Sequence, residues 1–190
     1  AALLPFVAAA ASSTAPQPAP SVVLFENVRI FDGTSARLSA ASNVLVVGNL
    51  IQSISTQATA PPTGSALTRI QGGGRTLMPG LIDNHVHIAL STTGQADLLS
   101  DATTADVLQA RATAEAGDML MRGFTSVRDM GGPMLTARPA IDKGELPGPR
   151  IYPSGAVITV TSGHGDFRQK HELPRIIGGP PSRMEQMGGS

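Results

Sequence analysis

Short runs of alternating apolar and polar residues dominate the chain between residues 22 and 71. This pattern predicts four strands, at 22–31, 43–47, 50–55 and 66–70. The second and third strands are separated by Gly48-Asn49, which is typical of a two-residue hairpin that begins with glycine. A region of roughly 55 residues with so little helix is too small to bury a core alone. We therefore expect this small β-module to pair with strands from elsewhere.

The pattern changes after Arg75, where strands alternate with helices. Consecutive apolar residues at 77–82 open a predicted strand over 77–88, and such a run is typical of a strand buried on both faces. The remaining predicted elements are a helix at 101–122, a strand at 124–129, a helix at 134–143 and a strand at 150–160. This alternation is typical of a parallel α/β sheet.

Three residue types refine the boundaries of the two predicted helices. Thr103 or Thr104 can cap the first helix, and Gly123 stands where a left-handed residue ends it. Pro139 must lie in the first turn of the second helix or kink it.

Two histidines at the end of the apolar strand are the main candidate for chemistry. Successive side chains of a strand point to opposite faces, so His85 and His87 project to one side while Val86 points away. In parallel barrels, functional residues lie at the carboxyl ends of strands. Neutral imidazoles without thiolates suit zinc, manganese, cobalt or nickel. The sequence therefore predicts half of a metal site here.

Composition excludes several classes of protein. Lys plus Arg and Asp plus Glu each number 14, so the formal net charge is zero and there is no electrostatic footprint for nucleic acid. The absence of cysteine from the sequence excludes disulfides and thiolate ligands, so a metal must be held by histidines and carboxylates.

The first residues have the composition of a processed leader. Residues 1–13 are apolar and then small, as in the core and cleavage region of a secretory signal, although a disordered Ala/Pro leader is the alternative. Pro5 interrupts about 11 apolar residues, too few to span a membrane. We expect a secreted or periplasmic protein, with a signal-peptide remnant and linker over 1–20. Both ends of the sequence have the composition of cut segments.

The segment Gly72–His87, GGGRTLMPGLIDNHVH, resembles the signature of the metal-dependent amidohydrolase superfamily. Segments 117–132 and 148–166 are similar to the branch that contains imidazolonepropionase-like enzymes, Xaa-Pro dipeptidases and ochratoxin-hydrolysing amidases. The resemblance implies an α/β fold: the start of a (β/α)8 TIM-like barrel, with about three strands present, preceded by a small β-sandwich module. The implied domains are the N-terminal part of a β-sandwich over 21–76 and a truncated barrel over 77–190.

The resemblance also implies a reaction and its cofactor. His85 and His87 match two ligands of a divalent metal site, with zinc expected as one or two ions, whereas the general base is expected downstream. The implied function is that of an N-terminal fragment of a hydrolase that cleaves a C–N bond in a small amide or dipeptide by metal-activated water, acting on Xaa-Pro dipeptides or N-acyl amino acids. A cyclic-amide hydrolase and a non-catalytic fragment remain alternatives, and the oligomeric state is left open.

Five further polar residues have weaker assignments. His164 lies between glycines and is predicted to contact substrate, with an ordinary loop histidine as the alternative. Asp166 is expected to stabilise the turn, and Asp83 to orient a ligand or satisfy the backbone. Asp129 is expected to support the site or to form a salt bridge. His171 is expected to be solvated.

Overall fold

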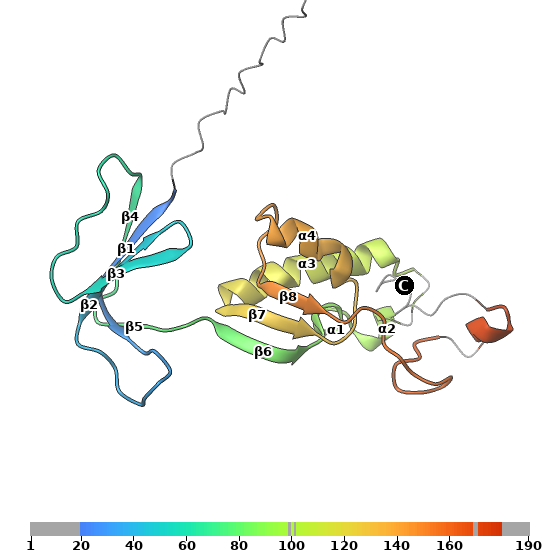
Figure 1. Ribbon diagram of the computed structural model, residues 1–190. Helices are drawn as coiled ribbons and strands as arrows, with labels where there is room; N and C mark the ends of the chain where they lie inside the picture. The colour runs from blue at the N-terminus through green and yellow to red at the C-terminus, as the bar shows by residue number, and fades with distance from the viewer. Residues whose placement is uncertain (1–19, 99, 101, 169–170, 180–190) are drawn as a thin grey trace, which may run out of the picture. The chain divides into compact units, whose positions relative to one another are not determined.

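The computed structural model describes residues 20–179, except 99, 101, 169 and 170 (Figure 1). The leader predicted over 1–20 therefore lies almost entirely outside the described residues. The described chain divides into two compact units, with the boundary between Pro79 and Gly80. No helix within the described ranges is long and apolar enough to cross a membrane.

The first unit is a five-stranded sheet. Its strands are β1 (Val22–Ile30), β2 (Ser42–Val47), β3 (Leu50–Ser55), β4 (Leu67–Gln71) and β5 (Thr76–Leu77). The order is β3-β2-β1-β4, with β5 pairing the far end of β1. β1 is antiparallel to β2 but parallel to β4 and β5. The predicted hairpin between β2 and β3 is confirmed, and Gly48 has the positive φ, 60°, that its turn requires.

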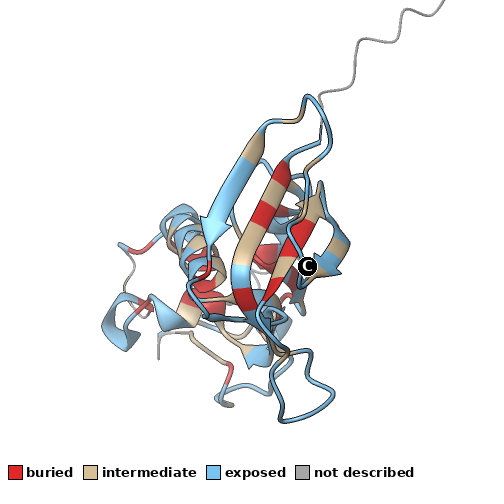
Figure 2. Cartoon of the chain, turned by 90° about the vertical axis from the view of Figure 1, so that its left-hand side faces the viewer, coloured by how far each residue is buried: buried red, intermediate tan, exposed pale blue. Residues whose placement is uncertain are grey.

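The sheet of the first unit is apolar on both faces. Val22, Leu24 and Leu45 form a buried cluster, and Figure 2 shows buried positions alternating with less buried ones along the strands. A second apolar hollow of about 440 Å³ is lined by Ile51 and Ile54, which are 65% and 55% exposed. This uncovered surface fits the expectation that the module pairs with further strands.

The second unit is a parallel sheet with interleaved helices. It consists of β6 (Leu81–Val86), α1 (Ile88–Ser91), α2 (Gln95–Leu98), α3 (Ala105–Met121), β7 (Phe124–Asp129), α4 (Met134–Asp142), β8 (Arg150–Pro153) and a 3-10 helix at Arg175–Ile177. The sheet order is β6-β7-β8, all parallel (Figure 1). The core lies where β7 and β8 pack against α3 and α4; Val127 and Ile151 meet Ala112, Ala116, Met119, Met134 and Ile141 there. The predicted α/β alternation is confirmed.

The single strand predicted over 77–88 is wrong. It is divided into β5 and β6, which belong to different units, and His87 already precedes α1. Pro79 cannot donate to a strand ladder, and a Cβ on Gly80 would lie only 2.1 Å from Thr125 Oγ1. Burial on both faces is also wrong, since Ile82 is 75% exposed. An apolar run shows only that a strand could be buried. Actual burial also needs other elements that pack against its side chains.

Two other boundaries differ from the predictions, and one of the two placements predicted for Pro139 is excluded. The first long helix begins at Ala105 instead of 101, because Thr104 caps it by accepting the Val107 N–H at 3.4 Å. Pro139 lies beyond the first turn of α4, so of the two alternatives, first turn or kink, the first-turn placement is wrong. The strand predicted over 150–160 ends at Pro153, which has no N–H to donate. The short helices α1 and α2 were not predicted.

We expect Ile151→Ala to destabilise the second unit by about 2–5 kcal/mol, because it removes a fully buried side chain at the centre of the core. Urea unfolding of the protein measures this loss. The matched control is Ile158→Ala, whose side chain is fully exposed and should change the free energy of unfolding by less than about 0.5 kcal/mol. Equal losses in the two variants would contradict the described packing.

Candidate metal and substrate site

Three of the four histidines gather at the carboxyl edge of the parallel sheet. A cavity of about 420 Å³ is lined by His85, His87 and His164. Its other lining residues are Leu90, Met130, Val157, Gly165 and Phe167. His85 is the penultimate residue of β6, His87 follows that strand directly and His164 comes after β8, so the parallel topology brings together side chains nearly 80 positions apart.

The two histidines of the metal prediction are neighbours. The ring centroids of His85 and His87 lie 5.3 Å apart, with the planes at 71°. Their strand is irregular here: Asp83 pairs with Val127 and Val86 with Asp129, so three steps on β6 match two on β7. Such a bulge re-aims side chains. The regular alternation of side chains along β6 is therefore interrupted between Asp83 and Val86. The Asp83 carboxylate accepts the His85 N–H at 3.0 Å.

His87 has the electrostatic character of a neutral ligand. Burial lowers its pKa, and the neighbouring His85 and His164 lower the pKa further. Its Nδ1 is buried without a hydrogen-bond partner among the described residues. A buried nitrogen without a partner is costly, and a metal ion or a substrate group would satisfy it.

Asp129 fixes the backbone beside His87. The carboxylate is fully buried at the end of β7, and its Oδ1 accepts the N–H of Ile88 at 3.1 Å. Burial raises the pKa of Asp129 to about 6, and the Ile88 hydrogen bond opposes this rise only in part. Within the described ranges Asp129 forms no salt bridge; the support that it gives there is a hydrogen bond to the main chain.

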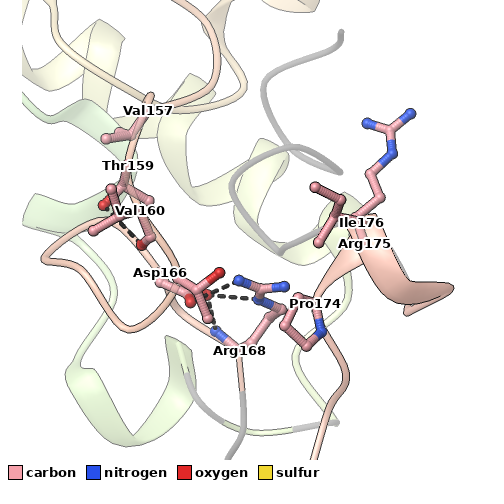
Figure 3. A pocket seen from close by; sticks show the side chains of 9 residues that line it. Val157, Thr159, Val160, Asp166, Arg168, Pro174, Arg175 and Ile176 are labelled. Atoms are coloured by element: carbon pink, nitrogen blue, oxygen red, sulfur yellow. Dashed lines mark hydrogen bonds and ion pairs between the residues drawn. The ribbon is translucent and has the colours of Figure 1, made fainter.

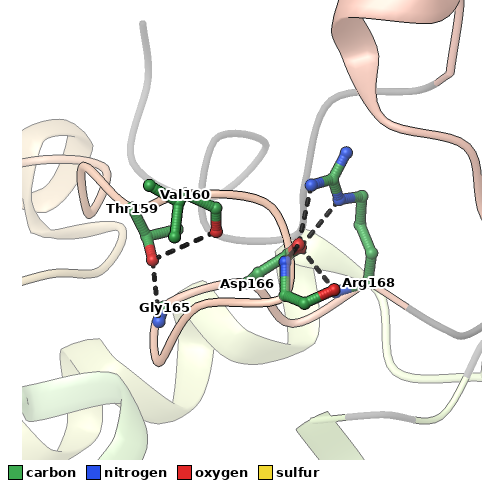
Figure 4. A network of polar contacts seen from close by, with 6 residues as sticks. Thr159, Val160, Gly165, Asp166 and Arg168 are labelled. Carbon is green, nitrogen blue, oxygen red and sulfur yellow. Dashed lines mark hydrogen bonds and ion pairs between the residues drawn. The ribbon is translucent and has the colours of Figure 1, made fainter.

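The remaining candidates lie in or after the loop that follows β8. His164 is exposed at the cavity, and His171 is exposed elsewhere. The expectation that Asp166 stabilises the turn is confirmed: it accepts the Ser162 N–H at 2.7 Å and pairs with Arg168 (Figure 4). The Arg168 guanidinium and the Ser162 amide hold the pKa of Asp166 well below its usual range.

The donor set is compatible with a metal but is incomplete among the described residues. Catalytic zinc sites use three protein ligands and leave a position open. His85 and His87 supply two nitrogens, and the described part of the chain contains no group of three or more histidines and carboxylates that could hold an ion. A complete site therefore needs at least one ligand from other residues.

Sequence reasoning missed the apolar wall of the cavity and the exact partner of Asp129. Leu90, Met130 and Phe167 come from three different segments, so no local pattern links them. The only signal for Asp129 was its position at the end of a strand, followed by two glycines.

A model described as the amidohydrolase family matches residues 76–179, more than half of the chain. The chain therefore belongs to the amidohydrolase family. Ochratoxinase from Aspergillus niger is 36% identical over 96 residues, which make up 48% of this chain and 19% of that protein.

Solved structures agree with this assignment. A prolidase complexed with N-methylphosphonate-L-proline is 31% identical, with a TM-score of 0.67 over 81% of this chain and 36% of its own. An Xaa-Pro dipeptidase with methionine bound in its active site is 29% identical, with a TM-score of 0.61 over 77% of this chain and 36% of its own. The chain thus spans about a third of these structures, and its fold class, the opening of an amidohydrolase barrel after a small β-module, is confirmed.

We expect Asp129→Asn to change the pH dependence of stability in the metal-free protein. The pKa of Asp129 is about 6 in the fold, against an ordinary 3.8, so the folded state binds this proton more tightly than the unfolded chain. The stability of the parent protein should therefore fall, through this group, as the pH rises from about 4 to 6.

Asn keeps an oxygen for the Ile88 N–H but does not titrate. Relative to the parent, the variant should gain about 1–3 kcal/mol between pH 4 and pH 7, measured by urea unfolding in the presence of a chelator. A difference between the two proteins that is independent of pH would show that Asp129 is ionised throughout.

Proposed function

We propose that this chain supplies the N-terminal part of a metal-dependent hydrolase that cleaves a C–N amide or peptide bond. Xaa-Pro dipeptides and N-acyl amino acids are the proposed substrates. The observation that carries the proposal is the cavity at the carboxyl edge, where three imidazoles converge and one buried nitrogen lacks a partner within the described part of the chain. The leader composition of residues 1–13 supports a place outside the cytoplasm.

His85 and His87 would hold a divalent ion, for which we propose zinc. A bound ion of this kind supplies Lewis acidity and makes water a nucleophile near neutral pH. The protein prepares its two ligands in two ways. The lowered pKa of His87 keeps that imidazole unprotonated near neutral pH. Asp129 fixes the main chain at Ile88, the residue directly after His87. The general base is proposed to come from outside the described residues.

His164 is proposed to bind the substrate. It faces the same cavity as the ligand pair but comes from a different loop, so an imidazole N–H there can donate to a carboxylate or a carbonyl oxygen. The apolar wall formed by Leu90, Met130 and Phe167 suits the side chain of an amino-acid substrate. The prolidase neighbour was solved with a proline phosphonate, a ligand that combines a carboxylate with an apolar ring.

We expect His85→Ala and His87→Ala to lose the bound ion and to reduce turnover by more than the roughly 10–100-fold that loss of an outer hydrogen-bond partner costs. The enzyme encoded by the full reading frame is assayed with Xaa-Pro dipeptides, N-acyl amino acids and a cyclic amide, and its metal is measured by elemental analysis. His171→Ala is the matched control, because this exposed histidine lies away from the cavity and should leave both readouts unchanged.

Two outcomes would contradict the proposal. Unchanged metal content in both ligand variants would remove the metal assignment. Turnover of the cyclic amide alone would replace the dipeptide and acyl-amino-acid assignment with a cyclic-amide hydrolase.

A further inference from the structure

The loop that carries His164 is closed by its own hydrogen bonds. Gly163 N–H donates to the Val160 carbonyl at 2.8 Å, and Gly165 N–H donates to Thr159 Oγ1 at 3.4 Å. The two glycines permit this close packing: a Cβ on Gly163 would lie 2.4 Å from Thr159 Oγ1, and one on Gly165 would lie 2.5 Å from a Val157 methyl. Glycine is also the residue with most conformational freedom to lose, so such a loop needs a fixed anchor.

Asp166 and Arg168 provide that anchor (Figure 4). The Arg168 Nε and Nη2 donate to the two carboxylate oxygens of Asp166, each at 2.7 Å, in a bidentate pair. The two side chains are only 13% and 7% exposed, unlike the other ion pairs of the described residues. The same carboxylate accepts the N–H of Ser162, a non-glycine residue with a φ of 62°. One carboxylate thus joins both ends of the turn around His164.

The ion pair and His164 line different hollows. His164, Gly165 and Phe167 line the cavity of the ligand pair. Asp166 and Arg168 line a separate hollow of about 580 Å³, where Figure 3 shows their side chains facing each other. A substrate in the first cavity would therefore meet His164 without touching the ion pair.

We infer that Asp166 and Arg168 are positioning residues, which hold the His164 side chain in the position where it would contact the substrate. This inference rests on the proposed role of His164. A misplacement of about 1 Å at a binding group costs up to roughly 100-fold in catalytic efficiency, and the Asp166–Arg168 pair is what restrains this glycine-rich loop. The pair would thus set substrate affinity without contacting substrate.

A double-mutant cycle on the full-length enzyme tests the inference, with the best substrate of the panel above. Asp166→Asn removes the ionic pair, and we expect it to lower kcat/KM roughly 10–100-fold, mostly through KM, with metal content unchanged. In the His164→Ala background the same substitution should have no further effect on kcat/KM, because its effect passes through His164. A merely structural role would give equal factors in both backgrounds.

Two further variants keep the test decisive. Arg168→Gln removes the cationic partner of the pair but retains the hydrogen bond from the Ser162 N–H to Asp166. This variant replaces Asp166→Asn in the cycle if Asp166→Asn does not fold. Asp142→Asn breaks the exposed pair with Arg138 on α4 and should leave kcat/KM unchanged.

The failures are distinguishable. If His164→Ala loses affinity but Asp166→Asn and Arg168→Gln do not, the positioning inference is overturned and the substrate role of His164 stands. If His164→Ala leaves kcat/KM unchanged, both are overturned, and the metal assignment is judged separately from the ligand variants.

Discussion

Parallel pairing of β6, β7 and β8 is the constraint on which the candidate site depends. Val86 pairs with Asp129, and Asp129 pairs with Pro153, so the three strands end at the same level. Two hydrogen bonds continue this alignment beyond the strands, from Met130 N–H to the Val86 carbonyl at 2.8 Å and from Ser154 N–H to the Asp129 carbonyl at 2.9 Å. Because the strands run in the same direction, everything that follows them emerges at one edge. His85, His87 and the His164 loop thereby share one cavity, with the buried carboxylate of Asp129 at the end of the neighbouring strand.

Two carboxylates serve this edge by opposite electrostatic means. Asp129 is buried with one main-chain hydrogen bond, and its pKa is raised. Asp166 accepts hydrogen bonds from the Arg168 guanidinium and the Ser162 amide, and its pKa is lowered. The first arrangement lacks a partner for Oδ2 among the described residues, and a buried carboxylate in that state is unfavourable when ionised. Groups of this kind concentrate near functional sites. The second arrangement is fully hydrogen-bonded, as a structural anchor requires.

Local pattern was enough to predict much of the fold and the close approach of His85 and His87. The hairpin at Gly48, the helix end at Gly123 and the alternation of strands and helices depend on neighbours within a few residues. The two histidines were identified by spacing of the same kind. The Asp129 bond to Ile88 spans 41 residues, and no local rule contains it. The turn role of Asp166 was predicted, but its pairing with Arg168, at a hollow that His164 does not line, depends on the folded loop.

The exposed apolar surface of β6 and the incomplete donor set of the described residues are found at the same strand. Ile82 is 75% exposed, and β6 pairs only with β7 among the described strands. A strand added at this open edge would run past the same end of the sheet at which His85 and His87 emerge. An element that covered Ile82 would therefore be placed to bring further polar side chains to the cavity. Among the described residues, the open strand edge and the incomplete donor set thus lie at the same strand, in a chain that spans about a third of these structural relatives.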